Sequence, residues 1–263
     1  MAHRFGAAGR TVALTLTVGV TISLAGCGSS PLSGPGYASK DNTTRHSAPL
    51  SRDELMTASY QAAMKAGSAH MGMTMSGQAA VKAQGDVAYT RGGSAMQMTM
   101  SMPQLGQGKI AMRYVGQIMY LQIPRLTPPG KFLAIDPRDQ GSPLAKSFAG
   151  LTGQMDPLDS VKSMGSAVIS ADRVGQGSFD GVPVDHYRVV VDAMKMMSKV
   201  NRTASAGMPK TVTYDLWLDN LHLIRKMTFD VSGTSVEIVL SKWGHAVKVR
   251  RPAAGDVLQA PGA

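Results

Sequence analysis

The stretch SAMQMTMSMPQ, from Ser94 to Gln104, decides the fold because it carries a methionine at every second position. Side chains of a β-strand alternate between two faces, so this spacing predicts a strand with a thioether face and a small, polar face. The stretch HMGMTMSG, from His70 to Gly77, repeats the pattern. Three interpretations compete: an ordinary core, a soft-metal site, or the lining of a cavity for an apolar ligand. The methionines concerned are Met71, Met73, Met75, Met96, Met98, Met100 and Met102.

The alternation continues on both sides of these stretches. Half-exposed segments separated by glycine turns are typical of an antiparallel sheet with one apolar face. One such segment adds Met112 and Tyr114 to that face. The segments are 81–89, 109–114 and 118–123, and the turns are expected at Gly77, Gly92-Gly93 and 106–108.

Helices are expected at three places. The sequence Ser51-Arg52-Asp53-Glu54 is a capping box that begins a helix to about Lys65, and Gly67 ends it. Helical spacing of apolar residues predicts one or two short helices over 142–164, and 193–200 is typical of a short amphipathic helix. The remaining strands are expected at 167–174, 184–192, 211–219, 222–231, 234–241 and 245–250.

About ten strands and three or four helices predict an α+β fold. A long antiparallel sheet with one apolar face has to curve over something, and the helices can cover its concave side. They are too few to fill it. A sheet curved around a partly filled interior is how lipocalin-like barrels form a ligand cavity.

The N-terminus has the features of an export signal. Arg4 and Arg10 precede the apolar run TVALTLTVGVTISLA (11–25), which is shorter than a typical spanning helix. The run ends in Leu24-Ala25-Gly26-Cys27, which resembles a bacterial lipobox, and Cys27 is the single cysteine of the chain. We therefore expect diacylglycerol on Cys27, which anchors the protein to the cell membrane at its extracytoplasmic face.

Four segments follow from this assignment. Residues 1–26 are the signal peptide, and 27–50, rich in Ser, Pro and Gly, are the lipidated cysteine and a flexible tether. Residues 51–252 contain no further low-complexity break and form one domain, and 253–263 are a flexible tail.

The formal net charge of +10 comes with only two glutamates, Glu54 and Glu237. A basic surface on a tethered protein favours an anionic membrane or anionic headgroups, although it also serves solubility alone. Nucleic acid is a poor partner for an exported protein whose basic residues do not cluster with aromatic ones.

Catalytic motifs are missing from the sequence. Acylation of Cys27 leaves no thiol nucleophile, and neither G-x-S-x-G nor H-E-x-x-H occurs. His186, His222 and His245 have no acidic partner at motif spacing. We therefore expect no enzymatic activity.

The metal interpretation rests on thioethers, which select Cu(I). Alternate methionines would place sulfurs about 7 Å apart on a strand face. His70 adjoins Met71 but points to the opposite face, and small polar residues separate the methionines within the strands. Copper is therefore the weakest of the three interpretations.

Composition distinguishes the other two interpretations, an ordinary core and the lining of a ligand cavity. Methionine normally fills gaps in a core, yet the 19 methionines outnumber the 14 aromatic residues. A rigid core would use Leu, Ile, Val and Phe instead. Unbranched thioether chains on neighbouring strands can repack around apolar ligands of variable shape.

The ending SVEIVLSKWGHAVKVRRP (235–252), with its LSKWG core (240–244), resembles that of the LppX/LprA/LprF/LprG family of mycobacterial and actinobacterial lipoproteins. GSAHMGMTMSG (67–77) and GQIMYLQI (116–123) are also similar to family segments. The resemblance implies a LolA/LolB-like half-barrel whose helices plug the concave face. It also implies a cavity that carries acylated lipids or glycolipids toward the outer envelope, without metal, cofactor or catalysis. This chain departs from the family by placing Met where relatives mostly carry Val, Leu or Ile.

The sequence thus predicts a membrane-anchored lipid carrier that is monomeric and binds an acyl lipid or glycolipid. The alternative is a structural or signalling lipoprotein with a filled core that acts through a protein partner. The residues expected to line the ligand cavity are Met71, Met73, Met75, Met96, Met98, Met100, Met112 and Tyr114.

Overall fold

The computed structural model describes residues 48–77, 80–90, 93–103, 108–139, 164–199 and 209–258. All of them belong to one compact unit. The expected signal peptide, Cys27, most of the tether and the mid-chain helices up to residue 163 lie outside the described residues. Within the described ranges, no helix has the length and apolar character needed to cross a membrane.

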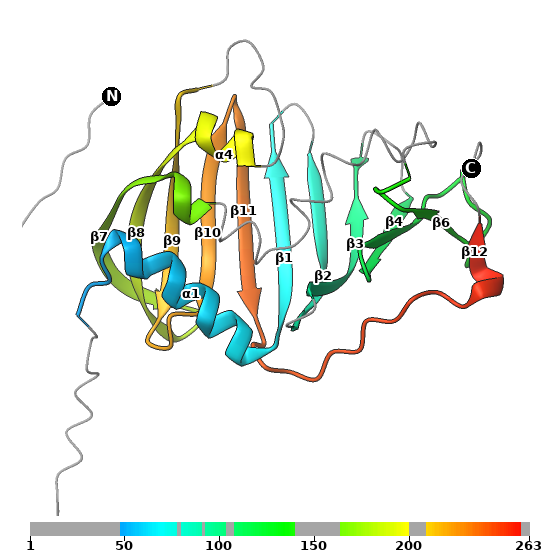
Figure 1. Cartoon of the computed structure of the whole chain (residues 1–263), viewed down its shortest axis with the longest axis horizontal. Helices are drawn as coiled ribbons and strands as arrows, with labels where there is room; N and C mark the ends of the chain where they lie inside the picture. Colours follow the sequence, from blue (N-terminus) through cyan, green and yellow to red (C-terminus); the bar gives the residue numbers. More distant parts are fainter. Residues whose placement is uncertain are drawn as a thin grey trace, which may run out of the picture. The chain divides into compact units, whose positions relative to one another are not determined.

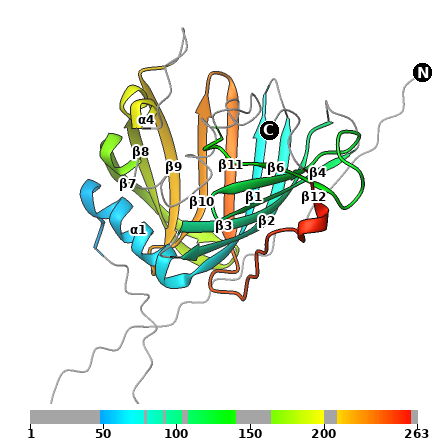
Figure 2. The ribbon, with the colours of Figure 1, turned by 45° about the vertical axis from the view of Figure 1, so that its right-hand side comes forward.

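The strands form a single curved, open sheet (Figure 1, Figure 2). Its order is β12-β6-β5-β4-β3-β2-β1-β11-β10-β9-β8-β7, antiparallel throughout except for the parallel β12–β6 pair. Two meanders, β1 to β6 and β7 to β11, meet where β1 pairs with β11. The α+β fold with a curved antiparallel sheet, predicted from the period of two, is confirmed. The strands are β1 (Ser68–Ser76), β2 (Val81–Thr90), β3 (Gly93–Ser101), β4 (Lys109–Val115), β5 (Ile118–Gln122), β6 (Phe132–Ile135), β7 (Val168–Phe179), β8 (Val182–Asp192), β9 (Thr211–Asp219), β10 (Ile224–Val231), β11 (Thr234–Ser241) and β12 (Val257–Leu258).

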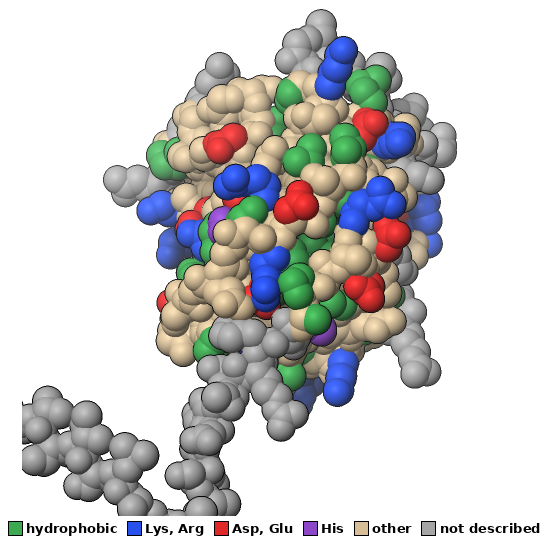
Figure 3. Space-filling view, turned by 90° about the vertical axis from the view of Figure 1, so that its left-hand side faces the viewer, with side chains coloured by type: hydrophobic (Ala, Val, Ile, Leu, Met, Phe, Trp, Pro, Cys, Tyr) green, Lys and Arg blue, Asp and Glu red, His purple; other side chains and the backbone are tan. Residues whose placement is uncertain are grey.

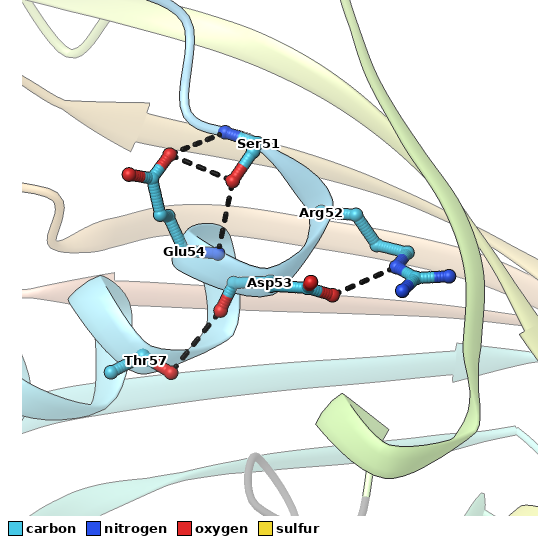
Figure 4. A network of polar contacts seen from close by, with 5 residues as sticks. All are labelled: Ser51, Arg52, Asp53, Glu54 and Thr57. Carbon is cyan, nitrogen blue, oxygen red and sulfur yellow. Dashed lines mark hydrogen bonds and ion pairs between the residues drawn. The ribbon is translucent and has the colours of Figure 1, made fainter.

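Helix α1 (Arg52–Ala66) begins and ends where the sequence predicts. The Ser51 hydroxyl accepts a hydrogen bond from the backbone N–H of Glu54, and the Glu54 carboxylate accepts from the Ser51 N–H at 3.0 Å (Figure 4). This N–H bond, with the hydroxyl bond beside it, lowers the pKa of Glu54. Gly67, at φ 77°, adopts the left-handed conformation that ends the helix. The other described helices are α4 (Ala193–Lys199), η2 (Ala254–Asp256) and a turn at 164–167.

Two groups of buried side chains share the face of the sheet that α1 covers, here called the inner face (Figure 1). The first cluster lies on β1 to β6 and includes Ala63 of α1. The second cluster lies mainly on β8 and β9 and includes Leu55 and Met56 of the same helix. One face of α1 thus packs against both meanders.

The expected strand at 245–250 is wrong: these residues are in no strand. Both edges of the preceding β11 are already occupied, by β1 and β10, so the chain cannot add a strand there. It runs instead to the far edge of the sheet, where β12 pairs with β6. Lys131 of the β5–β6 connection contacts Asp256 at 2.9 Å and holds this ending in place. Residues 254–258, which the sequence places in a tail, therefore form η2 and β12.

Two further differences concern strands that sequence periodicity does not detect. β6 has four residues between Pro- and Gly-rich connections, too short for a period to emerge. β7 continues to Phe179, through a segment that the sequence leaves between strands. Its pairing with β8 is irregular around Gly175, which an edge strand tolerates.

Candidate functional site

The eight residues predicted to line a cavity lie on the inner face. Directly paired residues in neighbouring strands point to the same side of a sheet. One row runs from Met73 through Ala83 and Met100 to Ile110. The next runs from Met71 through Gly85 and Met98 to Met112. Register thus places the methionines of β3 and β4 side by side, and those of β1 on the same face beyond β2. Met75 lies on the same side of β1, and Tyr114 lies beside Met96.

These side chains differ in exposure. Met96, Met98, Met112 and Tyr114 are buried, at 3–7% exposed, and belong to the first cluster. Met71, Met73 and Met100 are half-buried and pack against that cluster. Met75 is half-buried near the end of β1 and is not part of the cluster. The structure therefore brings together all the predicted residues except Met75.

Gly85 interrupts the second methionine row, and the β3 backbone fills the place that a side chain would take there. A Cβ at this position would lie 1.9 Å from the backbone oxygen of Gln97, so no other residue fits without moving β2 or β3. The row consequently has no side chain between Met71 and Met98. Two unbranched thioether chains thus flank a position that carries only backbone.

The site has neighbours beyond the eight predicted residues. Tyr60 and Met64 of α1 pack against the first cluster, as does Trp243. Trp243 also stacks on Tyr89, with ring centroids 5.9 Å apart. For Trp243 the sequence does contain a signal, the LSKWG segment, because a tryptophan two residues after the end of β11 has to lie near the sheet.

Two buried polar atoms near this region have no hydrogen-bond partner within the described residues: the Trp243 Nε1 and the Ser59 Oγ on the buried side of α1. Burying an unpaired polar group costs about 1–3 kcal/mol. Both atoms could donate a hydrogen bond to a ligand.

His70 and His186 lie on the other side of the sheet. His70 Nδ1 is 2.8 Å from Asp86 Oδ1, and Gln97 donates to the second oxygen of that carboxylate at 3.2 Å. The bond from His70 is the main cause that lowers the pKa of Asp86. His186 lies 2.7 Å from Asp215. Strand register supplies these acidic partners, which sequence spacing does not reveal.

His70 is therefore engaged away from Met71, as its position in the strand predicts. Over the described ranges, no three His, Cys, Asp or Glu side chains gather in a way that could hold a metal ion.

A pocket of about 370 Å³ opens on the face opposite the methionines, here called the outer face. Its lining residues include Gly72, Thr74, Gln84 and Thr99, all of which alternate with inner-face residues along their strands. Met73 and Met100 touch it, but Met71, Met98 and Met112 do not line it. This pocket is thus distinct from the cavity that the sequence predicts.

Charged side chains of both signs are interspersed on the side of the molecule that carries β7 (Figure 3). On this side, the described residues form no extended region of positive charge. The positive net charge of the sequence therefore does not gather there.

Solved structures share this fold. The chain is similar to LprF from Mycobacterium bovis, with a TM-score of 0.52 and 17% identity over 77% of this chain and 97% of that one. It is also similar to the lipoprotein LppX from Mycobacterium tuberculosis, with a TM-score of 0.53 and 16% identity over 76% of this chain and 98% of that one.

No protein-family model and no curated protein sequence matches the chain. The predicted resemblance to LppX and LprF is thus confirmed for the fold.

Proposed function

We propose that this protein binds the acyl chains of lipids or glycolipids between α1 and the methionine rows, and carries them while Cys27 anchors it to the cell membrane. The observation that supports this proposal most is the arrangement of Met71, Gly85 and Met98. Two flexible thioether chains beside a position without a side chain can separate with little strain. The binding site would then form as the acyl chain enters.

The half-buried methionines extend this region toward its margin. Met73 and Met100 flank Ala83, whose small side chain leaves room between them. Trp243 Nε1 offers a buried donor for an ester or amide carbonyl at the head of an acyl chain. The similarity to two mycobacterial lipoproteins supports an envelope location, and the lipobox supports the anchor.

The test is the lipid content of the purified protein. A chain that starts at Gly28 behind an ordinary secretory signal is expressed in an actinobacterial host, and its organic extract is analysed by mass spectrometry. We expect acyl lipid at about one molecule per chain. A protein that is free of lipid, and stays free after incubation with host lipids, contradicts the proposal.

Two variants locate the lipid. Met73→Lys with Met98→Lys should abolish loading, because charge on the inner face opposes burial of acyl chains. Thr211→Lys with Thr213→Lys adds the same charge at exposed positions of β9 and should leave loading unchanged. If the first variant does not fold, Met73→Phe with Met100→Phe fills the margin at half-buried positions and should lower loading. Unchanged loading in a folded variant places the lipid elsewhere.

A second candidate function follows from the burial of Met96, Met98 and Met112, at 3–6% exposed. Such packing also suits a filled core, in which case the protein would act through a protein partner. This candidate predicts lipid-free protein in the same extract. It also predicts a specific partner after cross-linking in intact cells.

A further inference from the structure

The outer-face pocket is unrelated to acyl-chain binding, because the sheet separates it from the inner face. Its residues form two cross-strand rows. Gly72 lies beside Gln84, which lies beside Thr99. In the second row, Thr74 lies beside Lys82, followed by Ser101 and Lys109. Gly72 carries no side chain, and a Cβ built there would contact nothing within 4 Å, so the space over this glycine is open.

Among the described residues, Glu237 is the one pocket-lining polar side chain that has a side-chain partner. Asp86, Asp215 and Glu237 are each paired with a basic side chain. In the described part of the chain, the polar groups of Thr74, Gln84, Thr99 and Ser101 make no side-chain hydrogen bond. Their donors and acceptors are thus available to a ligand that lies over Gly72.

The charges are unevenly distributed along the second row. Lys82 and Lys109 stand two strands apart, about 10 Å between backbones, with the Ser101 hydroxyl between them. Neither ammonium has an acidic partner among the described residues. Glu237, at the other end beside Thr74, is held by Lys226 at 2.6 Å. An anion fits the lysine end, and hydroxyl groups fit the end near Glu237.

We propose that this pocket binds a phosphate group attached to a hydroxyl-rich body, such as a sugar or polyol. The ammonium groups of Lys82 and Lys109 bind the phosphate as charge-assisted donors, with the Ser101 hydroxyl. The sugar lies over Gly72, where Gln84, Thr99 and Thr74 hydrogen-bond its hydroxyls. A volume of about 370 Å³ accommodates one such unit and lies at the small end of known ligand sites.

The experiment is calorimetric titration of the full-length lipoprotein in phosphatidylcholine nanodiscs. The probes are glucose 6-phosphate, inorganic phosphate and glucose. We expect glucose 6-phosphate to bind at least about tenfold more tightly than either fragment, because it uses both ends of the pocket. A protein that binds none of the three overturns the proposal.

Two variants locate the binding. Lys82→Gln with Lys109→Gln should weaken binding of glucose 6-phosphate at least about tenfold. The control Lys65→Gln with Lys210→Gln removes the same charge at exposed positions outside the pocket and should have no effect. Gly72→Val places a side chain in the open space over this position, where a Cβ meets nothing within 4 Å, and should abolish binding. Binding that survives Gly72→Val in the folded protein overturns the proposal.

The source of the phosphate is then identified by competition. If a lipid headgroup occupies the pocket, phosphatidylinositol in the nanodisc lowers the affinity for glucose 6-phosphate. Unchanged affinity indicates a free phosphorylated sugar or glycan, and both results support the site. The pocket variants should keep any acyl lipid that co-purifies, so the failure of one proposal is distinguishable from that of the other.

Discussion

The two buried clusters occupy the same face of the same sheet, yet they are built from different side chains. The second cluster uses mostly branched and aromatic residues on its strands, whereas the first adds methionines on β3, β4 and β5 to its branched and aromatic residues. Branched side chains have few rotamers and specify one packing, whereas methionine adapts to irregular gaps. We therefore call the part of the sheet that carries the second cluster the stiff half, and the part that carries the first cluster the deformable half. The fully buried residues of the second cluster include Tyr187, Val189, Val191, Val212, Leu216 and Leu218.

Helix α1 connects the two halves. Leu55, near its start, is fully buried in the second cluster, and Ala63, near its end, packs in the first. The stiff half can thus hold the helix in place while side chains rearrange beneath its other end. Any ligand that enters the first cluster would find α1 already fixed.

The largest expected effect is the difference between Leu216→Ala and Met98→Ala. Leu216 is 1% exposed and has stiff neighbours, so its truncation should leave a cavity and lower the free energy of unfolding by about 2–5 kcal/mol. Neighbouring methionines can partly fill the space at Met98, which should limit the loss to about 2 kcal/mol. Chemical denaturation of both variants measures this difference.

Native-state hydrogen exchange gives an independent check of the same comparison. Amides of β8 and β9 should exchange more slowly than those of β3 and β4. Equal losses in both variants, together with equal protection, would show that the two halves are equally rigid.

The next effect concerns Tyr214, in the second cluster. Burial raises the pKa of its hydroxyl to about 12. Between pH 10 and that value the unfolded chain loses this proton while the folded chain keeps it. This group therefore leaves the free energy of unfolding at its full value below pH 10. As the pH rises through 12, that free energy should fall by up to about 3 kcal/mol. Tyr214→Phe should remove this dependence, measured as unfolding midpoints at pH 9 and pH 11.5.

Strands β1 to β4 could be predicted from the sequence because their inner-face residues alternate mostly with polar or small ones. The same alternation places Met71 to Tyr114 on one face without any structure. Cross-strand register could not be predicted, since alternation says nothing about which strand lies beside which. Consequently the position of Gly85 between Met71 and Met98 could be found only from the structure.

The outer-face pocket could not be predicted from the sequence either. Gly72, Lys82 and Lys109 are far apart in the chain and belong to no motif. Residues 245–250 show the opposite error, a strand that the sequence predicts and the structure lacks. Their alternation is that of a strand, but no sheet edge is free beside β11. Local pattern predicts the faces of strands, whereas partners and edges depend on the whole topology.

A smaller effect should follow from Ser51→Ala at the start of α1. Loss of this cap should lower the free energy of unfolding by about 1 kcal/mol. Because α1 packs against both clusters, exchange protection should fall in β1 and in β8 alike. Thr57→Ala, one turn later, is the control, since the Thr57 hydroxyl only donates to the carbonyl of Asp53 within the helix.

The cap should also depend on pH. The Ser51 N–H lowers the pKa of Glu54, so the stabilisation is present above the ordinary value of 4.5 and declines as the pH falls through the lowered one. Ser51→Ala keeps the N–H bond but removes the hydroxyl bond to the Glu54 carboxylate, which also lowers this pKa, so the substitution should cost less at pH 3 than at pH 7. A loss of protection confined to β8 would mean that α1 stabilises only the stiff half.

The smallest change in stability, and the most informative, is expected for Met71→Leu with Met98→Leu. The two side chains are similar in volume, so unfolding should change by less than about 1.5 kcal/mol. Leucine is branched and cannot extend or fold back over Gly85 as methionine does. We therefore expect the folded variant to carry less lipid, or lipids with a narrower range of acyl-chain lengths. Mass spectrometry measures both.

The matched control is Met196→Leu with Met227→Leu, which makes the same exchange beside the second cluster. It should leave lipid content unchanged, because the proposed site lies in the other half. Equal effects of the two pairs would mean that flexibility is not localised in the first cluster. Full loading in the Met71 and Met98 variant would mean that acyl chains bind without displacing these thioethers, and the arrangement of Met71, Gly85 and Met98 would then lose its role in the proposal.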